Sequence, residues 1–193
     1  MSDYKVIVAG PKSAGKHTAI MTVSDGRKRA ADGAGMDMGA MRLDNGANIQ
    51  LYYATGKERI DYMWEMLSNN CLGLIFLLDN SRKDPIKDLH EFCHTYADFI
   101  SSSAIAVGVT KMDINDKPVL DYYHRSLNKV FIKAPVFEVD ARRREDISAL
   151  VNALYYSSSA RSAARLASTR QNPALFDQKT SACESFSQGG ASS

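Results

Sequence analysis

The chain has 193 residues, of which 45% are apolar and 24% are charged, and its formal net charge is +2. This apolar fraction excludes a chain that is disordered throughout, and the longest apolar run, Cys71–Leu78, is too short to span a bilayer. The positive surplus lies beyond residue 156, so the body is neutral and no nucleic-acid partner is expected. Three scattered cysteines and the absence of a signal-peptide pattern favour a cytoplasmic protein without stable membrane insertion.

Strand-like and helix-like segments alternate along residues 1–156. Apolar runs predict strands, and apolar residues spaced three or four apart predict helices. The expected strands are Tyr4–Ala9, Met38–Asp44, Ala47–Tyr53, Leu72–Leu78, Ile105–Thr110 and Val136–Val139. The expected helices are Lys16–Val23, Glu58–Asn69, Pro85–Ile100, Pro118–Val130 and Glu145–Tyr156. Asn45-Gly46 is typical of a hairpin turn, and the polar, glycine-rich segment Ser24–Gly35 is typical of a loop.

This order predicts a three-layer α/β domain over residues 1–156. Helices should cover both faces of a six-stranded, mostly parallel sheet with one antiparallel hairpin. Residues 157–193 are rich in serine and alanine, and they are expected to form a mostly disordered tail. The first third of this tail could prolong the last helix, because alanine, arginine and leucine favour helix.

A glycine-rich loop follows the first strand and opens the first helix. Gly10–Lys16 has the spacing G-x-x-x-x-G-K, in which backbone amides at a helix N-terminus cradle phosphates and the lysine reaches the outer ones. The candidate phosphate-binding residues are Gly10, Lys12, Ser13, Ala14, Gly15, Lys16, His17 and Thr18. A strand-to-helix turn without a ligand has the same glycines, so the loop alone leaves both interpretations open.

Two further segments at strand ends point to guanine. Thr110, Lys111 and Asp113 belong to T-K-M-D, in which the carboxylate can accept from N1 and the exocyclic amine of guanine while the lysine stem covers the ring. The next strand is followed by Asp140, Ala141 and Arg142, where a backbone amide could meet the guanine oxygen. Open α/β sheets bind their ligands at these carboxyl ends of the strands.

With these motifs in family order, the chain resembles the Ras-like small GTPases of the P-loop NTPase class. GPKSAGK is similar to their phosphate loop, TKMD to their base motif, VDAR to their S-A-K loop, and LYYATGKERIDYMW to L-x-D-T-x-G-Q-E-R-F. MDMG at Met36–Gly39, TGKERIDYMW and the D-A-R loop are similar to the bacterial branch encoded beside roadblock-type regulators. The resemblance implies a Ras-like P-loop fold, GTP or GDP as ligand, and a roadblock-type regulatory protein as partner.

The departures from the family pattern fall on positions that serve Mg²⁺, the γ-phosphate or hydrolysis. His17 stands at the metal-binding serine or threonine, Tyr53 at the D-x-x-G aspartate, and Lys57 at the water-orienting glutamine. Gly33 aligns with the switch threonine, and Lys12 borders the γ-phosphate position. Because Mg²⁺ demands oxygen ligands and a protonated lysine has no acceptor for a water, neither a catalytic residue nor Mg²⁺ is expected.

The sequence therefore predicts a degenerate, pseudo-GTPase-like module that binds guanine nucleotide weakly and serves bacterial signalling as a binding module or scaffold. One alternative is a slow, active GTPase that recruits its metal through Thr18 or water and needs a partner for hydrolysis. Another is a scaffold that binds no nucleotide and whose cradle is filled by side chains such as Lys12, His17 or Tyr53.

His90 to His94 also match the zinc motif H-E-x-x-H. The motif has three fixed letters, and Ala97 stands where its extended form requires glycine. We favour an outer helix with exposed histidines, which packs Leu89, Phe92, Tyr96 and Ile100 inward. The arginine run 142–144 is expected to form a solvated, partly self-paired surface.

Overall fold

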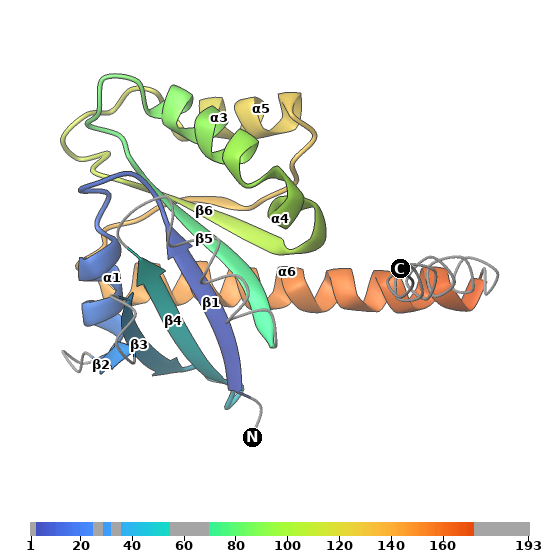
Figure 1. Ribbon diagram of the computed structural model, residues 1–193. Helices are drawn as coiled ribbons and strands as arrows, with labels where there is room; N and C mark the ends of the chain where they lie inside the picture. The colour runs from blue at the N-terminus through green and yellow to red at the C-terminus, as the bar shows by residue number, and fades with distance from the viewer. Residues whose placement is uncertain (1–2, 25–28, 32–35, 55–69, 172–193) are drawn as a thin grey trace, which may run out of the picture. The chain divides into compact units, whose positions relative to one another are not determined.

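The computed structural model describes residues 3–24, 29–31, 36–54 and 70–171. It has an α/β architecture with one seven-stranded sheet (Figure 1). The strands are β1 (Asp3–Ala9), β2 (Arg29–Ala31), β3 (Met36–Arg42), β4 (Asn48–Ala54), β5 (Cys71–Asp79), β6 (Ala104–Thr110) and β7 (Val136–Glu138). The helices are α1 (Lys16–Val23), α3 (Pro85–Thr95), α4 (Ala97–Ser102), α5 (Leu120–Lys129) and α6 (Arg144–Gln171). The predicted helix Glu58–Asn69 lies outside the described residues, as do Lys57 and Gly33.

The strands are arranged in the order β2-β3-β4-β1-β5-β6-β7. The pairs from β4 to β7 are parallel, whereas β3 is antiparallel to both β4 and β2. All six predicted strands are present, and β2 adds a seventh within the segment that we expected to be a loop. A three-residue edge strand needs little more than backbone hydrogen bonds, which polar and small residues supply as well as apolar ones, so its sequence carries no strand pattern.

The predicted hairpin joins β3 and β4. Gly46 has a φ of 85°, and its N–H donates to Leu43 O at 2.9 Å, while Leu43 N–H donates to Ala47 O at 2.9 Å. Glycine adopts this left-handed conformation without steric cost, which explains why the turn falls at Asn45-Gly46.

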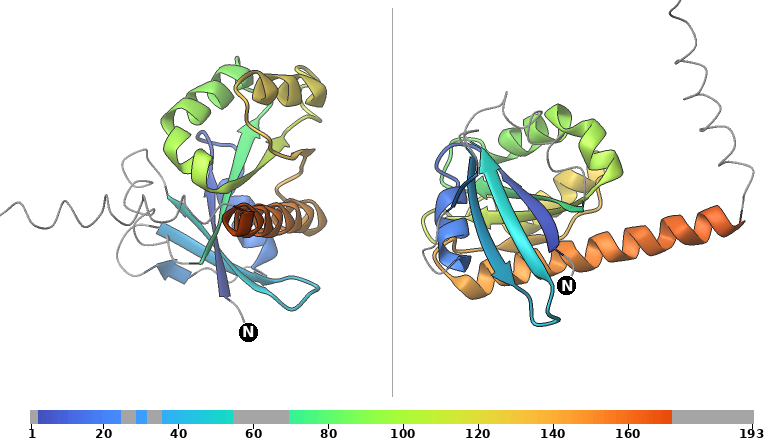
Figure 2. Two further views of the ribbon diagram at one scale, coloured as in Figure 1. Left: turned by 90° about the vertical axis from the view of Figure 1, so that its right-hand side faces the viewer. Right: turned by 60° about the horizontal axis from the view of Figure 1, so that its bottom comes forward.

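Two buried clusters lie on opposite faces of the sheet. On β1, Val6 and Val8 belong to the cluster with α1 and α6, whereas Ile7 and Ala9 belong to the cluster with α3, α4 and α5. This alternation is what a strand buried on both faces requires, and it confirms the three layers. In Figure 2 the helices of the first cluster are blue and orange, and those of the second are green to yellow.

The predicted helix Pro85–Ile100 is in fact two helices, α3 and α4, which meet at Tyr96. Tyr96 N–H donates to Phe92 O, and Ile100 N–H donates to Tyr96 O, so hydrogen bonding continues through the break. The apolar spacing also continues, which explains why no sequence pattern marks the break.

The chain divides into two units, residues 1–158 and 159–193. The first unit holds the whole sheet. Helix α6 extends to Gln171, so the start of the predicted tail prolongs the last helix, and residues 172–193 lie outside the described part. Across the described residues, every helix is too short or too polar to cross a membrane.

Candidate functional site

The Gly10–Lys16 loop follows β1, which lies between β4 and β5 in the sheet, and it opens helix α1. Gly10 has a φ of 145°, and a Cβ there would lie 2.1 Å from the carbonyl oxygen of Leu77. Gly15 is the N-cap of α1 and has a φ of 88°. Both positions therefore require glycine, because an L side chain is strained in these conformations and meets backbone at Gly10.

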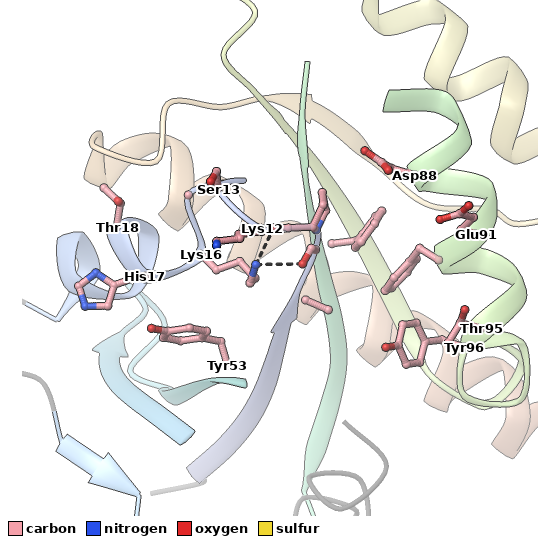
Figure 3. A pocket seen from close by; sticks show the side chains of 16 residues that line it. Lys12, Ser13, Lys16, His17, Thr18, Tyr53, Asp88, Glu91, Thr95 and Tyr96 are labelled. Carbon is pink, nitrogen blue, oxygen red and sulfur yellow. Dashed lines mark hydrogen bonds between the residues drawn. The ribbon is translucent and has the colours of Figure 1, made fainter. Parts of the chain in front are cut away.

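The Lys16 side chain folds back over the first residues of this loop. Its Nζ donates to Gly10 O at 2.9 Å and to Pro11 O at 2.7 Å (Figure 3). Burial lowers the pKa of the Lys16 ammonium. The first backbone N–H groups of α1 have no partner inside the helix and carry its positive dipole end. A cation and outward-facing amides can together hold an anion such as a phosphate, provided that Lys16 exchanges its carbonyl partners for the anion.

The second predicted segment follows β6 and packs against this loop. Thr110 is buried, and its Oγ1 lies 2.9 Å from Leu78 O and 3.3 Å from Ala14 O. Lys111 has a φ of 61°, and its Nζ donates to Asp79 Oδ2 at 2.5 Å. Asp113, the expected base-reading carboxylate, is exposed to solvent.

Asp79 and Asn80, at the end of β5, were not singled out from the sequence, yet they hold this segment in place. Burial alone would raise the pKa of Asp79, but hydrogen bonds from Lys111 and Ser81 outweigh it and keep this pKa below its ordinary value. Asn80 is fully buried, donates through Nδ2 to Asn115 O, and accepts from the Tyr123 hydroxyl. Two polar residues directly after an apolar strand were the signal that could have identified them.

The third predicted segment also reaches the Gly10–Lys16 loop. A Cβ at Gly15 would lie 2.9 Å from Ala141 Cβ, and Thr22 Oγ1 donates to Ala141 O at 2.9 Å. Arg142 folds back onto Asp140 with a 2.6 Å contact, and hydrogen bonds from Arg142 lower the pKa of Asp140 to about 2. The structure thus brings the three predicted segments together at one edge of the sheet.

The residues at the expected metal positions form a different arrangement. The rings of His17 and Tyr53 lie edge to face, with centroids 6.2 Å apart. The Tyr53 hydroxyl donates to the carboxylate of Asp37 on β3, a residue that the sequence analysis did not treat as part of the site. Burial, together with this hydrogen bond and the charge of Asp37, raises the pKa of Tyr53 to about 12. A protonated phenol and an imidazole do not fit the oxygen coordination that Mg²⁺ demands.

A cavity of about 670 Å³ opens beside the Gly10–Lys16 loop (Figure 3). Its described lining comes from the end of β1, the loop, the start of α1, Tyr53, Phe76 on β5, and one side of α3. The described lining does not include Lys111, Asp113 or Ala141. The hollow therefore extends from the loop towards α3 rather than towards the predicted base-binding segments.

The H-E-x-x-H match does not form a metal site in the described part of the chain. His90, Glu91 and His94 are exposed, whereas Phe92 and Cys93 are buried against the sheet. Within residues 3–24, 29–31, 36–54 and 70–171, no three His, Cys, Asp or Glu side chains are grouped to hold a metal ion. The expected amphipathic outer helix is confirmed.

The remaining candidate groups have structural partners or are buried. Burial raises the pKa of the Cys93 thiol to about 11 and also raises that of Cys71, so neither thiol is activated as a nucleophile. In the arginine run, Arg142 pairs with Asp140, and Arg143 lies 4.0 Å from Asp146, which agrees with a partly self-paired surface.

A comparison with protein-family models finds no match to this chain, and a search of curated proteins finds no significant relative. A function for this chain is therefore inferred from its sequence motifs and from the geometry of the site.

Proposed function

We propose that this chain is a Ras-like guanine-nucleotide-binding module of a bacterial signalling system, in which Mg²⁺-dependent hydrolysis has been lost. The observation that carries the proposal is the meeting of three segments at one sheet edge. Thr110 Oγ1 contacts the carbonyl oxygen of Ala14. Ala141 lies so close to Gly15 that a Cβ at Gly15 would be 2.9 Å from the Ala141 Cβ. A phosphate loop and two base-reading segments must be this close to hold one nucleotide.

The proposed roles follow from the chemistry of each segment. The amides at the start of α1 and the Lys16 ammonium would hold the phosphates, because they supply positive charge and N–H donors at one place. Asp113 is exposed and can accept from guanine, while the pair with Asp79 holds the Lys111 stem beside it. The roles proposed for these groups are to bind and orient the nucleotide, and none of them is proposed to activate a water.

The metal positions support binding without Mg²⁺. Tyr53 keeps its proton near neutral pH and donates it in a hydrogen bond to Asp37, and the His17 ring packs edge to face against the Tyr53 ring. The phosphates would then be held by Lys16 and the loop amides without a metal ion, which is why weak binding is proposed. Slow turnover with a hydrolytic partner remains the alternative, and a GTPase assay with and without candidate partners separates the two.

A scaffold that binds no nucleotide is the second candidate, and a specific observation favours it. Lys16 donates to two carbonyls of its own loop, and Lys111 donates to Asp79. Both cations are therefore satisfied within the chain. In either case the proposed partner, a roadblock-type regulatory protein, rests on the resemblance in sequence.

Calorimetric titration with GDP, GTP and ADP tests the proposal. GDP should bind while ADP should not, because adenine lacks the paired donors that a carboxylate reads. Asp113→Ala should abolish GDP binding, whereas Asp116→Ala, at a nearby exposed aspartate, should leave it unchanged. Equal affinity for GDP and ADP, or no effect of Asp113→Ala, would contradict guanine recognition.

A further inference from the structure

The proposed nucleotide would use only the loop end of the cavity. Its base would lie towards Lys111 and Asp113, whereas the hollow runs from the Gly10–Lys16 loop to α3 (Figure 3). At about 670 Å³ the cavity is within the size range of small-molecule sites, roughly 300–1,000 Å³. A ligand that fills the cavity must therefore extend from the loop towards α3, away from the segment that would hold guanine.

An aromatic row forms the wall of the cavity opposite the loop. Phe76 on β5 and Phe92 on α3 stack with ring centroids 3.5 Å apart, and the Tyr96 ring lies 4.8 Å from that of Phe92. Phe76 and Phe92 are buried and Tyr96 is half-buried, so the row is fixed by packing. Where they line the cavity, these side chains favour a planar apolar group, which can meet the rings edge to face.

The two ends of the cavity differ in the charge of the side chains that line them. Lys12 and Lys16 lie at the loop end, beside the N-terminus of α1. Two acidic side chains line the α3 end, but each has a cation of its own. Asp88 pairs with Arg82, and Glu91 lies 3.7 Å from Lys87. Neither acidic side chain therefore neutralises the loop end. An anionic group there can meet Lys12, and also Lys16 once it exchanges its carbonyl partners Gly10 O and Pro11 O for the anion, while the aromatic row lines the rest of the cavity.

We propose that this cavity binds a phosphate ester of a planar aromatic group. The phosphate lies at the Gly10–Lys16 loop, and the aromatic group lies against the row Phe76, Phe92 and Tyr96. The inference shares only the anion site with the proposed function and does not need guanine recognition. The inference also places Thr95 beside the bound ligand, because this exposed side chain on α3 lines the rim of the cavity.

Titration of the full chain with 1-naphthyl phosphate and with inorganic phosphate tests the inference. The ester should bind at least about tenfold more tightly, equivalent to about 1.4 kcal/mol, because only it reaches the aromatic row. Thr95→Trp should fill the rim and weaken the ester at least tenfold without changing phosphate binding. His94→Trp, at the exposed neighbouring position outside the described lining, is the matched control and should change neither.

The outcomes separate this inference from the proposed function. Equal affinity for the ester and inorganic phosphate would overturn it, as would equal effects of Thr95→Trp and His94→Trp. If GDP binds and the ester does not, the inference fails while the proposed function stands. If the ester binds and Thr95→Trp blocks it while GDP does not bind, the inference stands and guanine recognition fails.

Discussion

The ion pair between the buried Asp79 and the partly exposed Lys111 gives the sharpest test of how the segment from Thr110 to Asp113 is held. The Asp79 side chain is 4% exposed and that of Lys111 is 33% exposed. Removing one partner of a fully buried pair costs about 3–5 kcal/mol. In Asp79→Asn the lysine can turn towards water and the amide oxygen still accepts from Ser81, so the cost is that of one charged hydrogen bond, about 1.5–3 kcal/mol.

The same pair predicts a dependence on pH. The folded state lowers the pKa of Asp79 below its ordinary value of 3.8, because hydrogen bonds from Lys111 and Ser81 outweigh the effect of burial. A depressed pKa contributes stability above the unfolded pKa, and that contribution is lost as the pH falls through the folded pKa. The stability difference between wild type and Asp79→Asn should therefore be full near neutral pH and should shrink below about pH 4.

Urea unfolding of both proteins at neutral and acidic pH measures this difference directly. Other carboxylates titrate in both proteins, so the comparison isolates Asp79. Unchanged stability of Asp79→Asn near neutral pH would refute the reasoning, as would a difference that grows as the pH falls.

Three further variants follow from the geometry, two with a single substitution and one with two. Phe131 is 95% exposed with a φ of 57°, so Phe131→Gly should raise the free energy of unfolding by about 0.5–1 kcal/mol in urea, and a loss of stability would contradict this. A Cβ at Gly10 would lie 2.1 Å from Leu77 O, so Gly10→Ala should lower stability by about 2–3 kcal/mol in thermal unfolding, and full tolerance would contradict it. His17→Ser combined with Tyr53→Asp restores oxygen ligands, so Mg²⁺ should raise GDP affinity at least about tenfold in this variant, and no gain in calorimetry would contradict the metal argument.

Local patterns were enough to predict most of the sheet and its helices. The apolar strand Leu72–Leu78 lies within β5, Lys16–Val23 is the observed α1, and Gly46 has the left-handed backbone that Asn-Gly turns require. These features depend on residues close in the chain, which is why their spacing carries the information. The break at Tyr96 and the edge strand β2 have no such local signal.

The part of the site that a single continuous motif forms could be predicted from the sequence. The contacts between residues far apart in the chain could not. The glycines of Gly10–Lys16 indicated the conformation of that loop. The partners Asp79 and Asp37 depend instead on which strands are neighbours and on their register, because Asp37 faces Tyr53 only through the pairing of β3 with β4. The spacing of residues along the sequence does not give the register between β3 and β4. The hydrogen bond from the Tyr53 hydroxyl to Asp37 could therefore not be predicted.

Titration of the purified chain with GDP in the presence and absence of Mg²⁺ tests the central claim most directly. GDP should bind with the same affinity in both conditions, because Lys16 and the loop amides hold its phosphates without a metal ion. A gain of about tenfold or more on adding Mg²⁺, near 1.4 kcal/mol, would show that the site holds a metal after all and would contradict the account.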